Sequence, residues 1–403
     1  MVATVEASDN KRTTFSSWGN RQRIVAILLV GALLYGSFIA VDGLVLRHWL
    51  DASFGMTPDL HIYQERTSLI LNGGIIYRDL DIESPPLINY VLLPAQMIGG
   101  EWWAYEAYFS FFSIMTALSM YLVMRRWDGY RATLVALLVL VCPFALQDAT
   151  WGIQDEPMVA FFYILPVLLM LSGRRGASAA AAALGFWIKF LPIIVYPVTL
   201  VKLGERREVV KNIGIAVLTS VLIALPFLLL CPIEFLGFPS YYLLGRSGEG
   251  SAGMSVINLL GQGGLHIPGT VGAGLTVGVL IISYYLVYRW KLDIWRGAML
   301  TTVMFLSIYP MIRLGYFIFP FAFFSVWAVK DRGILLRLVP MYLALLFGQG
   351  LEASGLGLDP SYSWVVGIAL VAAGTIIMLD ITRLCLQRKS FLDRERREGP
   401  ASV

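Results

Sequence analysis

Carboxylate side chains gather in three short stretches of the sequence. Asp59 stands in the segment PDLHIY, Asp79 and Glu83 in YRDLDIESPP, and Asp155-Glu156 in QDEP. A carboxylate within about 3 Å of a hydroxyl can remove its proton while the oxygen forms a new bond. These acids are therefore candidates for a general base, and Asp59 is the first of them along the chain.

Three cations stand where they are unusual. Lys189 interrupts the apolar run WIKFLP, Arg313 lies in YPMIRLGYF, and Arg246 lies in a glycine- and serine-rich stretch. A charged side chain inside an apolar run is costly to bury and usually functional. Arg313 lies at the outer end of a span and needs an anionic partner, for which a phosphate is the first candidate. Lys189 would reach the same cavity as the acids if the two short helices on either side of it meet near the outer face. The alternatives are snorkelling for Lys189, a structural ion pair for Arg313 and unspecific lipid contact for Arg246.

The composition defines the class of protein that carries these groups. The 403 residues are 57% hydrophobic and only 14% charged, with a mean hydropathy of +0.70. Soluble domains carry about 25% charged residues, so a soluble enzyme is excluded, and a disordered chain would need low hydrophobicity. The apolar runs are long and continuous, which excludes a β-barrel. The three cysteines form no CxxC pair and the three histidines no HxxxH pair, so neither indicates a metal site.

Apolar runs near the roughly 20 residues that a spanning helix needs occur ten times, which predicts an all-α polytopic membrane protein. They are 24–46, 101–124, 131–147, 157–173, 209–232, 266–288, 296–309, 314–330, 334–351 and 364–384. A further run, 177–201, is broken by Lys189 and two prolines and is predicted to form two short helices. The expectation is 10 to 12 spans in one membrane domain, 24–386, between tails 1–23 and 387–403.

The basic residues predict how the chain is oriented. If the N-terminus is cytoplasmic and the spans alternate, most of the 31 Lys and Arg residues fall on the cytoplasmic side, as the positive-inside rule requires. Both tails are then cytoplasmic, in a plasma-membrane protein whose outer loops are 47–100, 148–156, 233–265 and 352–363. The acids gather in these outer loops. Alternatively, the outer loops are acidic only because positive charge is kept on the cytoplasmic side.

The first outer loop predicts a short interfacial helix. Leu60, Tyr63, Thr67, Ile70 and Leu71 recur at helical spacing, which favours an amphipathic helix over 59–71. Asp59 would lie at its N-cap or in its first turn, so capping alone is an alternative role for this acid. The same alternative holds for Asp155 and Glu156 before Pro157. Asn72-Gly73-Gly74 would end the helix, and the apolar run 87–99 is too short to span.

These motifs together resemble the GT-C superfamily of integral-membrane glycosyltransferases, which use polyprenyl-phosphate sugars. The resemblance spans about residues 24–330 and rests on Asp59, Gly74, Tyr77-Arg78-Asp79, Glu83, Pro85-Pro86, Asp155-Glu156, Lys189, Pro192, Arg313 and Tyr316. The DLHIY start is most similar to the α-mannosyltransferases that use polyprenyl-phosphate mannose. The YRDLDIESPPL part resembles the protein O-mannosyltransferase and aminoarabinose transferase branch, although Ser84 replaces the histidine of a His-Pro-Pro motif.

The resemblance implies an inverting, single-displacement transfer of a sugar, with mannose the first choice, to a hydroxyl of a lipid or glycan acceptor. Asp59 would be the general base, and Arg313, Lys189 and Arg246 would hold the donor phosphate. Further contacts to the substrates would come from a second group of residues, namely Asp155, Glu156, Tyr63, Tyr77, Asp79, Glu83 and Tyr316. Some members of the superfamily bind a divalent metal through acids placed like Asp59 and Asp155; others use no cofactor.

A polytopic transporter or lipid flippase is the competing class. The break around Lys189 is the type of element that transporters use at midplane sites. Against a transporter, no internal repeat is visible, and the acids concentrate at one face instead of at mid-membrane. The sequence therefore favours the enzyme, working in glycan biosynthesis with lipid-linked partners and no nucleic acid.

Overall fold

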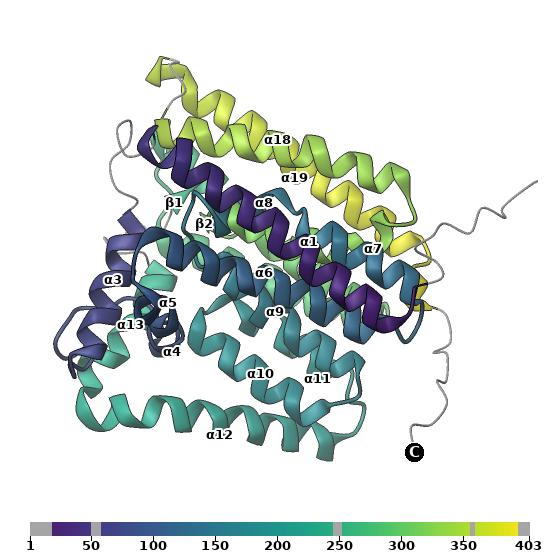
Figure 1. Cartoon of the computed structure of the whole chain (residues 1–403), viewed down its shortest axis with the longest axis horizontal. Helices are drawn as coiled ribbons and strands as arrows, with labels where there is room; N and C mark the ends of the chain where they lie inside the picture. The colour runs from purple at the N-terminus through teal and green to yellow at the C-terminus, as the bar shows by residue number, and fades with distance from the viewer. Residues whose placement is uncertain (1–17, 50–57, 245–251, 355–358, 394–403) are drawn as a thin grey trace, which may run out of the picture.

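The computed structural model describes residues 18–49, 58–244, 252–354 and 359–393, and helices make up nearly all of this part of the chain (Figure 1). The α-helices are α1 Asn20–Val41, α3 Pro58–Leu71, α4 Pro86–Val91, α5 Leu93–Ile98, α6 Trp102–Met124, α7 Gly129–Leu140, α8 Pro143–Ala149, α9 Glu156–Leu171, α10 Arg175–Ile188, α11 Tyr196–Val201, α12 Arg206–Leu230, α13 Pro232–Leu244, α14 Val256–Gln262, α15 Gly269–Arg289, α16 Ile294–Leu306, α17 Ile318–Ala328, α18 Arg332–Ser354 and α19 Pro360–Gln387. The shorter elements are the π-helix η2 Asp42–Leu46, the 3₁₀-helices η3 Leu191–Val195, η4 Leu314–Phe317 and η6 Phe391–Asp393, and the strands β1 Ala252–Gly253 and β2 Met311–Ile312.

The predicted all-α polytopic fold is confirmed, but fewer helices are long enough to cross a bilayer than the 10 to 12 expected. Within the described ranges six helices have the length and composition of a span, or seven if the bent pair α7–α8 is one span. Helices α9, α16 and α17 occupy three other predicted spans, yet they are 16, 13 and 11 residues long. A straight crossing takes about 20 residues. An apolar run in this chain therefore marks either a lipid-facing helix or a shorter, buried one.

The short apolar helices form the centre of the bundle. Every residue of α17 is buried, and the ring of Phe319 in α17 stacks on Tyr163 of α9 with centroids 4.4 Å apart. Trp295 of α16 donates a hydrogen bond to the carbonyl oxygen of Phe323 in α17. The longer helices α1, α12, α15, α18 and α19 surround this centre and leave many large apolar side chains exposed, as lipid-facing helices do.

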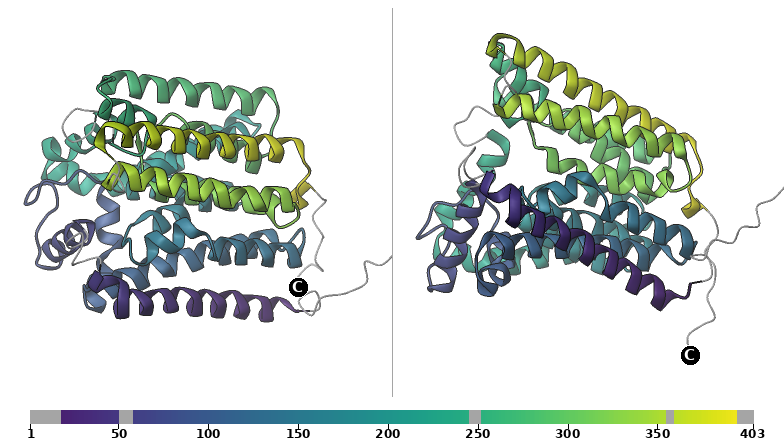
Figure 2. Two further views of the ribbon diagram at one scale, coloured as in Figure 1. Left: turned by 90° about the horizontal axis from the view of Figure 1, so that it is seen from above. Right: turned by 45° about the horizontal axis from the view of Figure 1, so that its top comes forward.

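The two ends of the bundle differ in what they carry. Helix α1 starts and α19 finishes at one end, whereas α3, α4, α5 and α13 gather at the other; Figure 2 shows α1, α18 and α19 running along a common axis between the two ends. Helices α4 and α5 cover the apolar run 87–99, which is too short to span as expected. The start of α1 and the finish of α19 therefore lie at the end of the bundle opposite to α3, α4 and α5.

Helix α3 agrees with the helix predicted over 59–71. Of the five residues in its predicted stripe, Leu60, Tyr63 and Thr67 are buried, Ile70 is half-buried and Leu71, in the last turn, is 49% exposed. Gly73 ends the helix with a φ of +81°, a left-handed conformation that glycine adopts without a steric penalty. The spacing and the glycine are local signals, which is why the sequence sufficed to locate this element.

The break at Lys189 is also confirmed. Helix α10 ends there because Lys189 itself is extended, with φ −151° and ψ 143°, and the chain resumes as η3 and α11. The break is packed tightly: a Cβ on Gly185 would lie 2.7 Å from Pro192 Cβ and 3.1 Å from the carbonyl oxygen of Phe162. This geometry turns the Lys189 side chain away from the helix that precedes it.

The two short strands bring distant loops together. Strands β1 and β2 pair in parallel, with Gly253 beside Ile312, and the N–H of Met254 donates a hydrogen bond of 3.0 Å to the carbonyl oxygen of Ile312. The returning end of the loop 233–265 therefore lies beside the residue that precedes Arg313. This pairing fixes the backbone from which the Arg313 side chain projects.

Candidate active site

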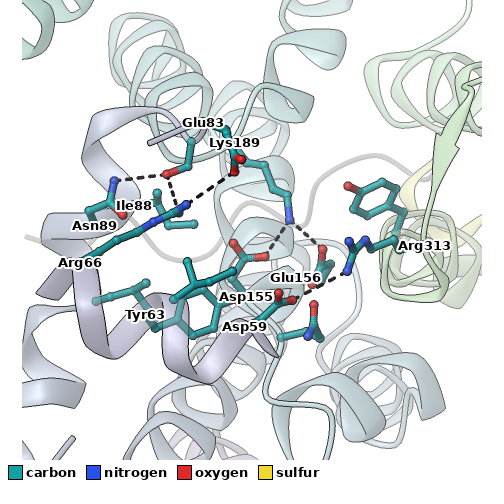
Figure 3. Close-up of a pocket in the computed structure, with 15 residues that line it drawn as sticks. Asp59, Tyr63, Arg66, Glu83, Ile88, Asn89, Asp155, Glu156, Lys189 and Arg313 are labelled. Carbon is teal, nitrogen blue, oxygen red and sulfur yellow. Dashed lines mark hydrogen bonds and ion pairs between the residues drawn. The ribbon is translucent and has the colours of Figure 1, made fainter. Parts of the chain in front are cut away.

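A cavity of about 340 Å³ opens at the end of the bundle that carries α3, α4 and α5 (Figure 3). Its lining comes from four segments far apart in the sequence, and it consists of Asp59, Ile62, Tyr63, Arg66, Glu83, Ser84, Ile88, Asn89, Leu92, Gln154, Asp155, Glu156, Lys189, Arg313 and Tyr316. Eight of the predicted site residues are in this set. The volume is in the range of small-molecule sites.

Lys189 lies in one wall of the cavity, between two carboxylates. Its Nζ donates to Asp155 Oδ1 and to Glu156 Oε1, each at 2.7 Å, and the three side chains are 13%, 9% and 2% exposed. Nζ also lies 5.4 Å from the centroid of the Tyr316 ring. Asp155 makes no capping hydrogen bond with its side chain. Its observed contact is thus the ion pair and not a cap, and Lys189 points at these acids instead of snorkelling to an interface.

Asp59 and Arg313 form a more open pair across the cavity. The distance from Arg313 Nη1 to Asp59 Oδ2 is 3.7 Å, and the two side chains are 55% and 26% exposed. Asp59 lies in the first turn of α3, and Arg313 directly precedes η4. Both side chains point into the same space (Figure 3), so a bound group can reach the carboxylate and the guanidinium together.

A third polar group in the cavity centres on Arg66, which was not among the predicted site residues. Arg66 Nη1 donates to Ser84 Oγ at 3.0 Å, and Nη2 lies 3.7 Å from Glu83 Oε2. Asn89 Nδ2 also donates to Ser84 Oγ. Arg66 follows Asp59 by seven residues, two helical turns, so helical spacing alone could have indicated that the two share a face.

Tyr77 and Asp79 lie outside the cavity and shape the loop that borders it. The Tyr77 hydroxyl donates to the carbonyl oxygen of Ser84 at 2.7 Å, while its ring packs edge-on against Phe235 at a centroid distance of 5.3 Å. Asp79 is bound by Arg78, with Nε to Oδ1 at 2.8 Å. The structure therefore gives Tyr77 a positioning role for the Glu83–Ser84 segment, whereas the Asp79 carboxylate is bound by Arg78 and by the N–H of Ile75 on its own loop. Arg246, the third predicted phosphate ligand, lies outside the described residues.

The surroundings of the acids affect their proton affinities in opposite directions. Burial raises the pKa of Asp155 to about 6, even though the Lys189 ammonium acts against that rise. The Arg78 guanidinium and the N–H of Ile75 lower the pKa of Asp79 to about 2. Asp79 is accordingly a permanent anion at physiological pH, whereas Asp155 can take up a proton in mild acid.

Asp148 is a buried acid that the sequence did not single out. It is 5% exposed, and the backbone of η4 lies directly against it. A Cβ added to Gly315 would collide with Asp148 Oδ2 and would lie 2.7 Å from Glu156 Cγ. Only glycine fits at this position, so the segment that carries Arg313 and Tyr316 is held close to the acids of the neighbouring wall.

The donor set does not suit a divalent metal. The described ranges contain no group of three or more His, Cys, Asp or Glu side chains that could hold an ion. Asp155 accepts a hydrogen bond from Lys189, and Asp59 faces Arg313. A metal between Asp59 and Asp155 would therefore have to displace two cations of the protein.

Comparison with solved structures shows that the fold is similar to that of ArnT. Two crystal structures of ArnT from Cupriavidus metallidurans, one bound to undecaprenyl phosphate and one in the apo state, superpose with TM-scores of 0.53 and 0.51. The alignments cover 91% and 90% of this chain and 78% and 77% of ArnT, at 14% and 15% sequence identity. Identity this low shows the fold alone. No family model and no curated protein matches the sequence.

Proposed function

We propose that the protein is a membrane glycosyltransferase that moves a sugar, with mannose the first candidate, from a polyprenyl-phosphate donor to a hydroxyl of a lipid or glycan acceptor. The observation that carries the proposal is the open pair of Asp59 and Arg313 in one cavity. Sugar transfer from a phosphate needs a base near the acceptor hydroxyl on one side of the anomeric carbon and a cation near the leaving phosphate on the other, and this cavity offers one of each.

The chemistry is a single displacement. Asp59 accepts the proton of the acceptor hydroxyl as that oxygen bonds to the anomeric carbon. The bond from this carbon to the phosphate oxygen breaks on the opposite side, and its electron pair leaves with the phosphate. Attack opposite to the leaving group inverts the configuration at the anomeric carbon. Arg313 and Lys189 stabilise the charge of the departing phosphate.

Lys189 and Arg313 contribute differently to phosphate binding. Arg313 is the more exposed cation, and its fork of N–H groups matches a phosphate bidentately. Lys189 already donates to two carboxylates, so its field is partly neutralised before any ligand binds. We assign the main phosphate contact to Arg313 and a secondary one to Lys189.

An apolar cavity beside the site supports a lipid-linked donor. It measures about 260 Å³, starts at Phe190, the neighbour of Lys189, and continues along Leu280 and Tyr284 of α15. A prenyl chain is apolar along its whole length and gains free energy by leaving water for such a surface. The undecaprenyl phosphate in one of the similar ArnT structures supports the same choice of carrier.

The direct test incubates the purified protein with polyprenyl-phosphate mannose and candidate lipid or glycan acceptors, and follows sugar transfer. The same carrier bearing glucose tests the choice of sugar, and Asp59→Asn serves as the catalytic control. Transfer by the parent protein that is lost in D59N supports the proposal. Movement of the donor lipid across vesicles without any transfer would assign the protein to the flippase class.

We also propose that Asp59 faces the outside of the plasma membrane and that both tails are cytoplasmic. The support is the clustering of acids at one end of the bundle and of the start of α1 and the finish of α19 at the other. A cysteine introduced at Ser53 or Ser251 should react with an impermeant thiol reagent from outside. Exclusive labelling from inside would reverse the orientation.

A further inference from the structure

A basic cavity lies away from the proposed active site, where α11 and α15 end. It measures about 380 Å³ and is lined by Val201, Lys202, Tyr288, Arg289 and Lys291. Just beyond it, Arg296 binds Asp393, which follows α19. The basic cavity therefore belongs to the end of the bundle at which α19 finishes, opposite to α3, α4 and α5 (Figure 1).

The cations of this cavity carry a surplus of positive charge. Lys202, Arg289 and Lys291 form no ion pair with an acid in the described ranges. Asp293 is the acid that attracts Lys202, but Asp293 Oδ1 caps α16 and Oδ2 binds Arg296 Nη1 at 2.6 Å. This acid is thus already engaged, so the positive charge of the cavity favours an anionic ligand.

The surroundings of the cavity are those of a membrane interface. Tyr288 and Trp290, on either side of Arg289, are 68% and 53% exposed, and exposed aromatic side chains with basic neighbours are typical of the lipid headgroup level. One to two turns earlier on α15, Ile281 and Tyr285 are 62% and 59% exposed. The lining of the cavity therefore includes cations, and an apolar surface that acyl chains can contact lies next to it on α15.

We propose that this cavity binds the phosphate group of an anionic glycerophospholipid. Basic pockets between membrane helices attract anionic headgroups, and the Arg289 guanidinium can hold two phosphate oxygens at once. A free phosphate ion offers the same chemistry, so the two sources are separated by the test. The inference does not depend on sugar transfer.

Binding of a lipid phosphate in this cavity would connect helices that also support the proposed active site. Helix α11 contacts both α15 and α16, and it continues through η3 to Lys189 at the proposed active site. A lipid phosphate that bridges Lys202 and Arg289 joins α11 to α15. Anionic lipid should therefore stabilise the folded protein as well as bind to it.

The test compares lipids and variants of the full chain, purified in a neutral detergent. Phosphatidylglycerol, phosphatidylcholine and inorganic phosphate are added separately, and binding is followed by native mass spectrometry and by the thermal unfolding midpoint. The cavity variant is K202Q/R289Q/K291Q. The matched control is R206Q/R207Q/K211Q, which removes the same charge from exposed positions at the start of α12.

For the parent protein and the control variant, phosphatidylglycerol should bind and raise the unfolding midpoint, and phosphatidylcholine should not. The cavity variant should bind phosphatidylglycerol about 100-fold more weakly, because each basic residue at an anionic surface strengthens binding severalfold. If that variant does not fold, R289Q alone should weaken binding about tenfold.

Equal stabilisation by inorganic phosphate would support the cavity but assign it to the free ion. Equal loss of phosphatidylglycerol binding in the cavity and control variants would overturn the proposal, since general surface charge would then explain it. Failure of the parent protein to distinguish phosphatidylglycerol from phosphatidylcholine would overturn it as well. Sugar-transfer activity enters none of these readouts.

Discussion

Two of the cation–carboxylate sites that line the proposed active-site cavity, Lys189 with its two acids and Arg313 with Asp59, differ in almost every physical respect. Lys189 lies 2.7 Å from each of two acids, and all three side chains are nearly buried. Arg313 lies 3.7 Å from a single acid, Asp59, and more than half of its side chain is exposed. The first site is closed before any ligand arrives, whereas the second is open.

This difference indicates that the closed site stabilises the fold, whereas the open site takes part in the reaction. Buried ion pairs lose so much hydration that removing one partner leaves a costly, uncompensated charge. An exposed pair holds its partners weakly, so a substrate can separate them at little cost. We therefore expect substitutions at Lys189 to act mainly on stability, those at Asp59 mainly on turnover and those at Arg313 mainly on donor binding.

The largest effect is expected for Lys189→Met. The change leaves Asp155 and Glu156 buried without their cation, which should lower the free energy of unfolding by about 3–5 kcal/mol. Denaturant unfolding in detergent measures it. The control D155N/E156Q/K189M removes the uncompensated charges and should recover most of the loss. A K189M variant as stable as the parent protein would show that the closed site is not structural.

Next in size is Asp59→Asn. The amide has nearly the same volume but cannot take a proton from the acceptor, so turnover should fall about 100-fold or more while the unfolding midpoint stays unchanged. Transfer from polyprenyl-phosphate mannose under donor saturation gives the rate. Asp81→Asn, at an exposed acid outside the cavity, is the matched control and should stay active. An active D59N enzyme would move the base to Asp155, another acid of the cavity that lies near Asp59.

Arg313→Ala should raise the KM for the donor about tenfold, because one charge-assisted contact to the phosphate is lost. The kcat should fall less than in D59N. Arg313→Lys keeps the charge without the bidentate fork, so its KM for the donor should lie between those of the parent protein and R313A. Donor titrations at fixed acceptor concentration measure the change. A folded R313A variant with an unaltered KM for the donor would assign the main phosphate contact to Lys189 instead.

Mild acid should reduce activity about tenfold between pH 7 and pH 5. The pKa of Asp155 is raised to about 6, so this acid takes up a proton in that range and its ion pair with Lys189 weakens. The folded state binds this proton more readily than the unfolded state, so between pH 6 and pH 4 Asp155 itself adds stability as the pH falls. Activity and stability should thus diverge. D155N should lose this acid limb of the pH–rate profile.

The closed and open sites also show how much the sequence reveals. Lys189 and Arg313 were predictable because each interrupts an apolar run. Asp59 was predictable because it starts a helix whose buried residues Leu60, Tyr63 and Thr67 recur at helical spacing. These are local signals. The pairing of Lys189 with both acids was not predictable, since it depends on where α10 breaks relative to α9.

What the sequence missed depends on contacts between distant segments. Arg66 reaches Ser84 only because the 75–85 loop folds back on α3, and Asp148 lies against Gly315 only through packing of η4 on α8. For the same reason, fewer helices of spanning length occur in the described ranges than the apolar runs suggest. Helix α17 is apolar because protein surrounds it completely, and hydropathy does not distinguish that environment from lipid.

The smallest effect is expected at Asp79, which the sequence grouped with the site but the structure binds to Arg78 on the loop outside the cavity. Its two oxygens accept from the guanidinium and from the N–H of Ile75, so Asp79→Asn removes an exposed ion pair and keeps part of the turn. Turnover should stay within about twofold of the parent protein, as exposed pairs contribute little. Because the pKa of Asp79 is lowered to about 2, the stability that it adds is present above about pH 4 and is lost only as the pH falls toward 2. The D79N and parent pH–rate profiles should therefore coincide between pH 5 and pH 8. A loss of turnover in D79N as large as that in D59N would show that this loop closes onto the substrate and that the open site extends beyond the cavity.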